Sequence, residues 1–241
     1  METHLPDPEL RRRRINGALW AVVISWVVLA ALFAVIDLDI SVAFADRSSQ
    51  WALFLERYGE YPASYFITVA VLSLLLWLVL LVAGRIVHSN DPKRLATRYI
   101  PTELRQFIVF TAVMNVVCRL FFVVLSKRYW GRVRFKDLSD SYAEFTAWYV
   151  INGVTGHYSF ASGHAASGWM VLPLIILARR APRSVQRFVA LTCFVWGFAV
   201  SVSRVRIGAH YASDVLFSTG VCILVFLLLL RWIPRKSRGL A

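Results

Sequence analysis

The chain has 241 residues, of which 58% are hydrophobic, and its mean hydropathy is +0.59. This apolar share exceeds that of a soluble domain and indicates a membrane protein with one domain. The 27 Lys and Arg against 14 Asp and Glu give a net charge of +13, which basic loops facing anionic lipid headgroups explain better than nucleic-acid binding does. Cys118, Cys193 and Cys222 lie in apolar runs without metal-ligand spacing, so we expect buried thiols and no disulfide framework.

Apolar runs in chain order predict an all-α bundle of six transmembrane helices. The first run follows Arg11 to Arg14 and, at 22 residues, is long enough to span and too long for the core of a signal peptide. Arg119 interrupts the third run, and Pro173 in the fourth run predicts a kink. The predicted spans are 15–36, 61–84, 107–125, 164–181, 188–203 and 211–230.

The distribution of basic residues predicts which way the bundle faces. With the N-terminus in the cytoplasm, 17 Lys and Arg lie inside and nine outside, and Arg119 lies within a span. This excess predicts a multi-pass protein of the cell membrane with both termini cytoplasmic. We expect a cytoplasmic basic tail over 1–14, a single six-span domain over 15–233 and a second cytoplasmic basic tail over 234–241.

Seven of the nine outer basic residues fall in two loops, 127–163 and 204–210, which suggests a chemical role there. The stretch "KRYWGRVRF" carries Lys127 and Arg134 just beyond the third span. Cations beside Tyr and Trp are also typical of a lipid interface, and this stretch alone leaves both interpretations open.

The stretch "GHYSFASGH" places Ser162, Gly163 and His164 where the fourth span begins. Unpaired backbone N–H groups at a helix N-terminus can bind an anion, and a glycine lets that anion approach closely. A serine N-cap followed by an interfacial histidine is the alternative interpretation.

The stretch "SRVRIGAHYASD" contains Arg204, His210 and Asp214 between two apolar runs. His210 and Asp214 are four residues apart and would share a helix face, and an ionisable residue within a span is a candidate for function. A loop arginine with a His–Asp pair that joins two helices is the alternative.

Together the three stretches lie on the same outer side and favour phosphoryl transfer, in which positioning and charge neutralisation dominate. No carboxylate-rich cluster accompanies them, so we expect Lys and Arg to take the role of a metal, with no metal and no cofactor. In this order and spacing the motifs resemble those of the phosphatidic acid phosphatase type 2 superfamily. This superfamily includes lipid phosphate phosphatases and, more distantly, vanadium haloperoxidases. The motifs are Lys127-x6-Arg134, Ser159-Phe-Ala-Ser-Gly-His164 and Ser203-Arg204-x5-His210-x3-Asp214.

The resemblance implies a role for each motif residue. His210 resembles the nucleophile that forms a phosphohistidine, with Asp214 accepting a hydrogen bond from one ring nitrogen. His164 resembles the general acid that protonates the leaving oxygen and then activates water. The groups expected to hold the phosphate oxygens are Lys127, Arg134, Arg204, Ser162 and the backbone N–H of Gly163. Phe135 and Ala161 stand where the family usually has proline, which affects loop rigidity more than chemistry.

The implied activity is hydrolysis of a phosphate monoester or pyrophosphate on a membrane lipid at an extracytoplasmic site, without nucleic acid. Four lipid substrates fit this activity: undecaprenyl pyrophosphate, phosphatidylglycerophosphate, phosphatidate and lipid A phosphates. An extracytoplasmic site slightly favours undecaprenyl pyrophosphate, the prenyl carrier lipid. A lipid-to-lipid phosphotransferase with the same intermediate is the alternative. A transporter or proton relay is disfavoured because the polar residues gather at one face, and a haloperoxidase because such enzymes need not span a bilayer.

Four further features have no catalytic assignment. We expect His157 to be structural and Arg119 to pair with a structural partner such as Asn115. Arg206 is expected to be solvated. The segment 140–152 is equally compatible with an interfacial helix that guides a headgroup and with a packed cover.

Overall fold

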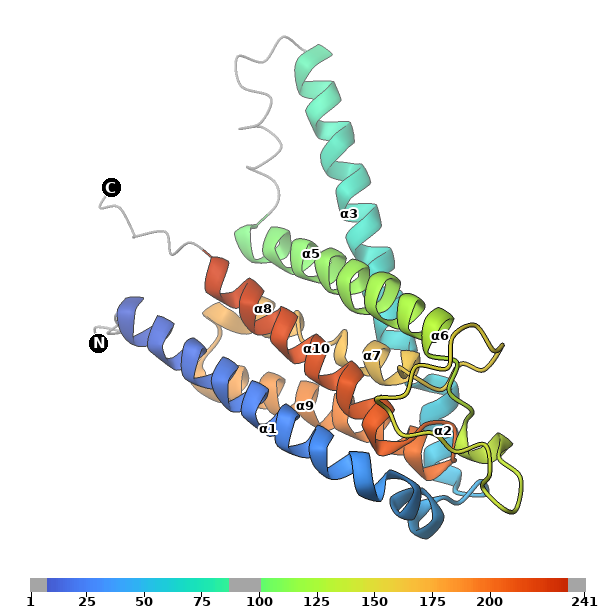
Figure 1. The fold of residues 1–241 in the computed structure, drawn as a ribbon. Coiled ribbons are helices and arrows are strands. Elements are labelled where there is room, and N and C mark those ends of the chain that lie inside the picture. The colour runs from blue at the N-terminus through green and yellow to red at the C-terminus, as the bar shows by residue number, and fades with distance from the viewer. Residues whose placement is uncertain (1–7, 87–100, 234–241) are drawn as a thin grey trace.

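The computed structural model describes residues 8–86 and 101–233, which form helices joined by loops and contain no strand. Figure 1 shows long helices packed side by side, with α3 leaning away from the others at one end. In chain order the helices are α1 (Pro8–Phe44), α2 (Gln50–Tyr58), α3 (Tyr61–Ile86), α5 (Thr102–Met114), η1 (Asn115–Val123), α6 (Val124–Trp130), η2 (Phe135–Asp137), α7 (Gly163–Trp169), α8 (Leu174–Leu177), η3 (Ala178–Arg180), α9 (Arg183–Arg206) and α10 (Ala212–Trp232).

Five helical stretches are long and apolar enough to cross a membrane, within the part of the chain that the structure describes. They overlap five of the six predicted spans, which confirms a multi-pass all-helical membrane protein. The five stretches are Glu9–Phe44, Gln50–Leu76, Thr102–Asp137, Arg183–Arg206 and Ala212–Trp232.

Helix α1 continues eight residues beyond the predicted end of the first span. The stretch 37–60, expected as a loop, is instead largely helical, because it holds the end of α1 and all of α2. The charged residue Asp37 lies within α1. Its buried carboxylate is tolerated there because it accepts hydrogen bonds from an arginine and a serine, as described below. Arg206 then joins the ends of α1 and α9, donating to the carbonyl oxygen of Phe44 and to Asp46, so the expectation of a solvated side chain is wrong.

The fourth predicted span, 164–181, is broken near Pro173, where the sequence predicts a kink. Helix α7 ends at Trp169. Backbone hydrogen bonds between residues three apart then lead into the single turn of α8. Pro173 stands at this break because it has no N–H to continue the helical ladder. Residues 165–172 are nevertheless buried, so this broken segment lies in the core of the bundle.

The third span is continuous, but its centre, η1, is a π-helix in which each turn holds more residues than an α-helical turn. Arg119 lies in this π-helix and donates to Oδ1 of Asn115, whose amide in turn donates to the carbonyl oxygen of Thr111. The expectation that Arg119 has a structural partner is thereby confirmed.

The helices pack closely where side chains are small. Helix α1 lies along α10, and α7 lies against α9. A Cβ added at Gly197 of α9 would lie 2.5 Å from Cδ2 of Trp169, and one added at Gly168 of α7 would lie 2.8 Å from Cβ of Val200. These glycines therefore set how near α7 lies to α9. The expectation of buried thiols is confirmed, because all three cysteines are free and buried.

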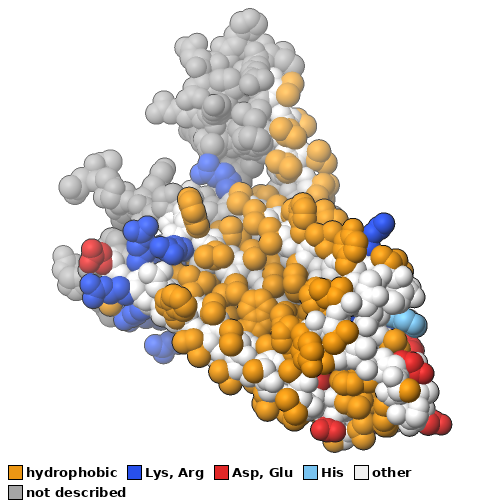
Figure 2. Space-filling view, viewed as in Figure 1, with side chains coloured by type: hydrophobic (Ala, Val, Ile, Leu, Met, Phe, Trp, Pro, Cys, Tyr) orange, Lys and Arg blue, Asp and Glu red, His pale blue; other side chains and the backbone are white. Residues whose placement is uncertain are grey.

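The charges divide between the two ends of the bundle. In Figure 2 most of the visible Lys and Arg gather at the end where α1 begins and α10 ends, while most of the visible Asp and Glu and the visible His lie toward the opposite end. Hydrophobic side chains cover the flank between these ends, as expected for a surface that faces lipid.

Gly197→Ala should destabilise the protein by about 1–3 kcal/mol, the usual cost of overpacking a tight core. The added methyl group would overlap the Trp169 ring, which donates hydrogen bonds to Ser201 and Thr219 and cannot easily shift. Thermal unfolding in detergent measures the effect. Gly17→Ala on α1, where a Cβ would meet nothing within 4 Å, is the matched control, and an equal response in both variants would contradict this account.

Candidate active site

The three sequence motifs meet at the end of the bundle opposite the start of α1 and the end of α10. The end of α6, the loop before α7, the end of α9 and the start of α10 approach one another there (Figure 1). Lys127 and Arg204 are both among the charged neighbours of His164 and of His210. Segments far apart in the sequence thus form one cluster of cations and imidazoles.

His210 is buried in the turn between α9 and α10. Its Nδ1 lies 2.6 Å from the carbonyl oxygen of Ser159. Because a carbonyl oxygen only accepts, Nδ1 must carry the hydrogen, and Nε2 therefore keeps the lone pair of the neutral ring. Burial lowers the pKa of His210 to about 4, so the imidazole is neutral at physiological pH.

Asp214 acts on His210 through the backbone and not by the direct hydrogen bond that the resemblance implies. Its Oδ2 lies 3.6 Å from Nδ1 of His210, beyond hydrogen-bond distance. The same oxygen accepts from the backbone N–H of Tyr211 at 3.0 Å and from Oγ of Ser159 at 2.5 Å. Asp214 therefore holds both the residue after His210 and the residue whose carbonyl oxygen orients its ring.

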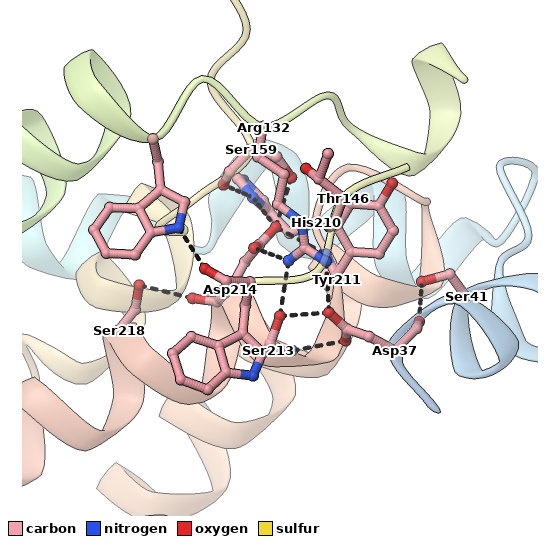
Figure 3. Close-up of polar contacts among 12 residues, drawn as sticks. Asp37, Ser41, Arg132, Thr146, Ser159, His210, Tyr211, Ser213, Asp214 and Ser218 are labelled. Carbon is pink, nitrogen blue, oxygen red and sulfur yellow. Dashed lines mark hydrogen bonds and ion pairs between the residues drawn. The ribbon is translucent and has the colours of Figure 1, made fainter. Parts of the chain in front are cut away.

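A buried arginine, Arg132, connects Asp214 to α1 (Figure 3). Its guanidinium donates to Oδ1 of Asp214 at 2.7 Å and to Oδ2 of Asp37 at 2.8 Å. It also donates to Oγ of Ser213 and to the carbonyl oxygen of Thr146, and it lies 3.9 Å from the centroid of the Tyr211 ring. One cation thus joins helix α1, the loop before α7 and the start of α10.

The sequence analysis missed both Arg132 and Asp37. Arg132 stands between the motif residues Lys127 and Arg134 and has no distinguishing local pattern. The available signal was Asp37 itself, because a carboxylate next to a long apolar run requires a buried partner of opposite charge. The sequence does not indicate which of the chain's many arginines that partner is.

Ser162 and Gly163 begin α7 beside Lys127. Oγ of Ser162 accepts from the backbone N–H of Ala165, so this serine is an N-cap, as the alternative interpretation proposed. A Cβ added at Gly163 would lie 3.7 Å from Nζ of Lys127, an ordinary contact distance. The ammonium group of Lys127 therefore lies beside the first turn of α7, and both cations and helix N-termini are groups that attract anions.

Arg204 and Arg134 add two further cations. Arg204 is buried, its Nη1 lies 3.1 Å from Oε1 of Glu56, and its Nε has no hydrogen-bond partner among the described residues. Arg134 is half-buried and is a charged neighbour of both Lys127 and Arg204. Three cations close together repel one another, which favours an anion between them.

His164, in the first turn of α7, faces a carboxylate that the sequence analysis also missed. Its Nδ1 lies 3.5 Å from Oε1 of Glu60, and that oxygen accepts a hydrogen bond from Oγ of Ser167 at 3.0 Å. The side chains of His164 and Glu60 are about one-third exposed, at 31% and 35%. The helix–turn unit formed by α2 and the start of α3 thus contributes two carboxylates, Glu56 and Glu60, to the site.

Two unassigned features lie on the loop before α7. The segment 140–152 forms turns and extended backbone, so the interfacial helix is wrong, and Trp148 packs against α1 by donating to the carbonyl oxygen of Ala30. His157 is exposed, and its backbone N–H donates to Oγ1 of Thr155. Among the residues that the structure describes, no three His, Cys, Asp or Glu side chains are grouped as metal ligands.

Comparison with known proteins identifies the class of protein. The sequence model of the PAP2 superfamily matches residues 105–238, more than half of the chain and all three motifs. The chain therefore belongs to the PAP2 superfamily, and the prediction of a membrane phosphatase of this class is confirmed.

The chain is similar to one individual relative and to one solved structure. The chain is 25% identical over 206 residues to phosphatidylglycerophosphatase B of Haemophilus influenzae (strain ATCC 51907 / DSM 11121 / KW20 / Rd), an alignment that covers 79% of this chain and 84% of that protein. The crystal structure described as the first transmembrane PAP2 type phosphatidylglycerolphosphate phosphatase from Bacillus subtilis matches 92% of this chain and 98% of its own. The identity is 20% and the TM-score 0.48.

Asp37→Asn should lower stability by about 1.5–3 kcal/mol, because it weakens a hydrogen bond to a buried charged group. Arg132→Gln should cost more, about 3–5 kcal/mol, since it leaves two buried carboxylates without their shared cation. Thermal unfolding in detergent measures both. Asp39→Asn, at an exposed position on the same helix, is the control, and our assignment is wrong if it lowers stability as much as Asp37→Asn does.

Proposed function

We propose that this protein hydrolyses the phosphate monoester of a membrane lipid through a phosphohistidine on His210, without a divalent metal. The observation that carries the proposal is the tautomer of His210. Its Nδ1 is bound to the carbonyl oxygen of Ser159, so Nε2 presents a lone pair beside the cations Lys127 and Arg204. A buried, neutral and oriented imidazole is a competent nucleophile.

In the first step Nε2 of His210 attacks phosphorus, and the bond between phosphorus and the lipid oxygen breaks. The departing oxygen takes its proton from His164. Lys127, Arg134 and Arg204 balance the charge on the three phosphoryl oxygens, and the unpaired Nε–H of Arg204 is available for one of them. The hydroxyl group of Ser162 and the backbone N–H of Gly163 supply further donors.

In the second step water attacks the phosphorus atom and gives a proton to His164. The nitrogen–phosphorus bond breaks, inorganic phosphate leaves, and His210 returns to its neutral form. His164 thus acts as acid and then as base, which its partly exposed position at the start of α7 permits.

The broken segment from α7 to η3 is the sixth crossing in our proposal. Gly163, at its start, lies beside Lys127 near the end of the third span, whereas Arg179, near its end, donates to Gln106 close to the beginning of that span. The segment therefore runs the length of the third span. Six crossings place both termini on one side, and the basic end in Figure 2 favours the cytoplasm for that side and an extracytoplasmic active site.

The substrate that we propose to test first is phosphatidylglycerophosphate, which the name of the Haemophilus relative supports. Purified protein in EDTA should release inorganic phosphate from it faster than from phosphatidate, undecaprenyl pyrophosphate or lipid A phosphate. If the labelled phosphoryl group of the substrate appears on an acceptor lipid and no inorganic phosphate is released, the result would support the phosphotransferase alternative. Activity that disappears in EDTA and returns with magnesium would contradict metal independence.

The variants His210→Ala and His164→Ala should lose activity at different steps of the reaction. Without His210 no phosphoenzyme can form, so both covalent capture and turnover should be lost. Loss of His164 should slow lipid hydrolysis by roughly 10²–10⁴-fold, the range of general acid–base catalysis. With an aryl phosphate, whose leaving group needs little protonation, His164→Ala should still form the phosphoenzyme and should accumulate it.

Rapid quench with labelled substrate measures this difference. Label that is acid-labile and base-stable in His164→Ala, and absent from His210→Ala, is the expected result. Label retained in His210→Ala would assign the nucleophile to another residue.

A further inference from the structure

Glu60 occupies the turn between α2 and α3, and the packing of that turn holds it at the site. A Cβ added at the preceding Gly59 would lie 3.0 Å from Cγ2 of Val200, so the turn lies directly against α9. Val200 also contacts Gly168 of α7. This packing holds the α2–α3 turn against the elements that carry Arg204 and His164.

The surroundings of His164 contain charges of both signs. The cations Lys127, on α6, and Arg204, on α9, act against protonation of its ring, as does burial. The anions Glu56 and Glu60, near the end of α2, act in favour of protonation. A general acid must be protonated before it can act, so in this cationic site His164 requires a nearby negative charge.

Glu60 is the carboxylate within ion-pair distance of His164, at 3.5 Å from Nδ1, and the hydroxyl of Ser167 holds the same oxygen. Glu56 lies instead against Arg204. The two carboxylates therefore have separate partners, one an imidazole and one a guanidinium.

We propose that Glu60 is a positioning residue that holds His164 protonated and directs its Nε2 to the leaving oxygen. This inference rests on the proposed role of His164 as general acid. A proton on Nδ1 points to Glu60, which leaves Nε2–H as the donor to the substrate. Glu60 itself touches neither the phosphate nor the lipid oxygen.

The proposal assigns opposite charge states to the two histidines of the site. His210 donates its Nδ1–H to a neutral carbonyl oxygen, which leaves the ring neutral and nucleophilic. His164 faces a carboxylate, which stabilises the imidazolium ion that an acid requires. Nδ1 of His210 thus has a bonded carbonyl oxygen at 2.6 Å and the Asp214 carboxylate farther away at 3.6 Å, whereas Nδ1 of His164 has the Glu60 carboxylate at 3.5 Å.

The test is Glu60→Gln, which keeps the size of the side chain and its acceptor for Ser167 but removes the charge. Hydrolysis of phosphatidylglycerophosphate should fall roughly 10–100-fold in kcat, less than on loss of His164 itself. The high-pH limb of the kcat/KM profile should move to lower pH. The burst of phosphoenzyme formation with 4-nitrophenyl phosphate should be unchanged, because that leaving group needs little protonation.

Three further variants separate this role from a structural one. In a His164→Ala background Glu60→Gln should cause no additional loss. Glu60→Asp, which restores the charge, should recover part of the activity and of the pH profile. Glu103→Gln, which removes a carboxylate paired with Arg180 far from the site, should leave activity and pH profile unchanged.

An equal loss with both substrates, an unshifted pH profile, or a further loss in the His164→Ala background would overturn the inference. Trapping of labelled phosphate on His210 tests the proposed function separately from the role of Glu60. Label on His210 with a Glu60→Gln enzyme that behaves as wild type would refute the role of Glu60 alone, whereas absence of any label would refute the proposed function.

Discussion

The active end of this protein depends on one buried cation shared by two buried carboxylates. Arg132 is fully buried and donates to Asp37 of α1 and to Asp214 of α10, which are buried as well. Removing three charged groups from water is costly, and only complete pairing offsets that cost. The guanidinium also binds Ser213 and the carbonyl oxygen of Thr146, so the hydrogen-bonding groups of this cluster are paired with one another.

This cluster determines where the nucleophile lies. Asp214, held by Arg132, accepts from Ser159 and from the backbone of Tyr211. Ser159 then supplies the carbonyl oxygen that fixes the tautomer of His210. The orientation of one imidazole therefore depends on hydrogen bonds that reach back to α1, far away in the sequence. A displacement of α1 against α10 would disturb the nucleophile without any change at the phosphate site.

The cations of the site are arranged differently from this buried cluster. Lys127 and Arg134 remain half-buried, and the buried Arg204 keeps an Nε–H that has no partner within 8–86 and 101–233. Glu56 and Glu60 reduce the mutual repulsion of these groups. The structure thus separates a fully paired set of charges, which holds the fold, from an incompletely paired set, which is suited to binding an anion.

The sequence by itself determined the all-helical membrane class, five of the spans and the three motifs, because hydropathy and motif spacing are local properties of the chain. It indicated the break between α7 and α8 only as a kink at Pro173, and it did not determine the partners of Asp37, Asp214 and His164. Those depend on which side chains meet when α1, α2 and α10 pack, and a buried charge accepts any partner of opposite sign that packing brings near. Only the tertiary structure therefore selected Arg132 among the arginines and placed Glu60 beside His164.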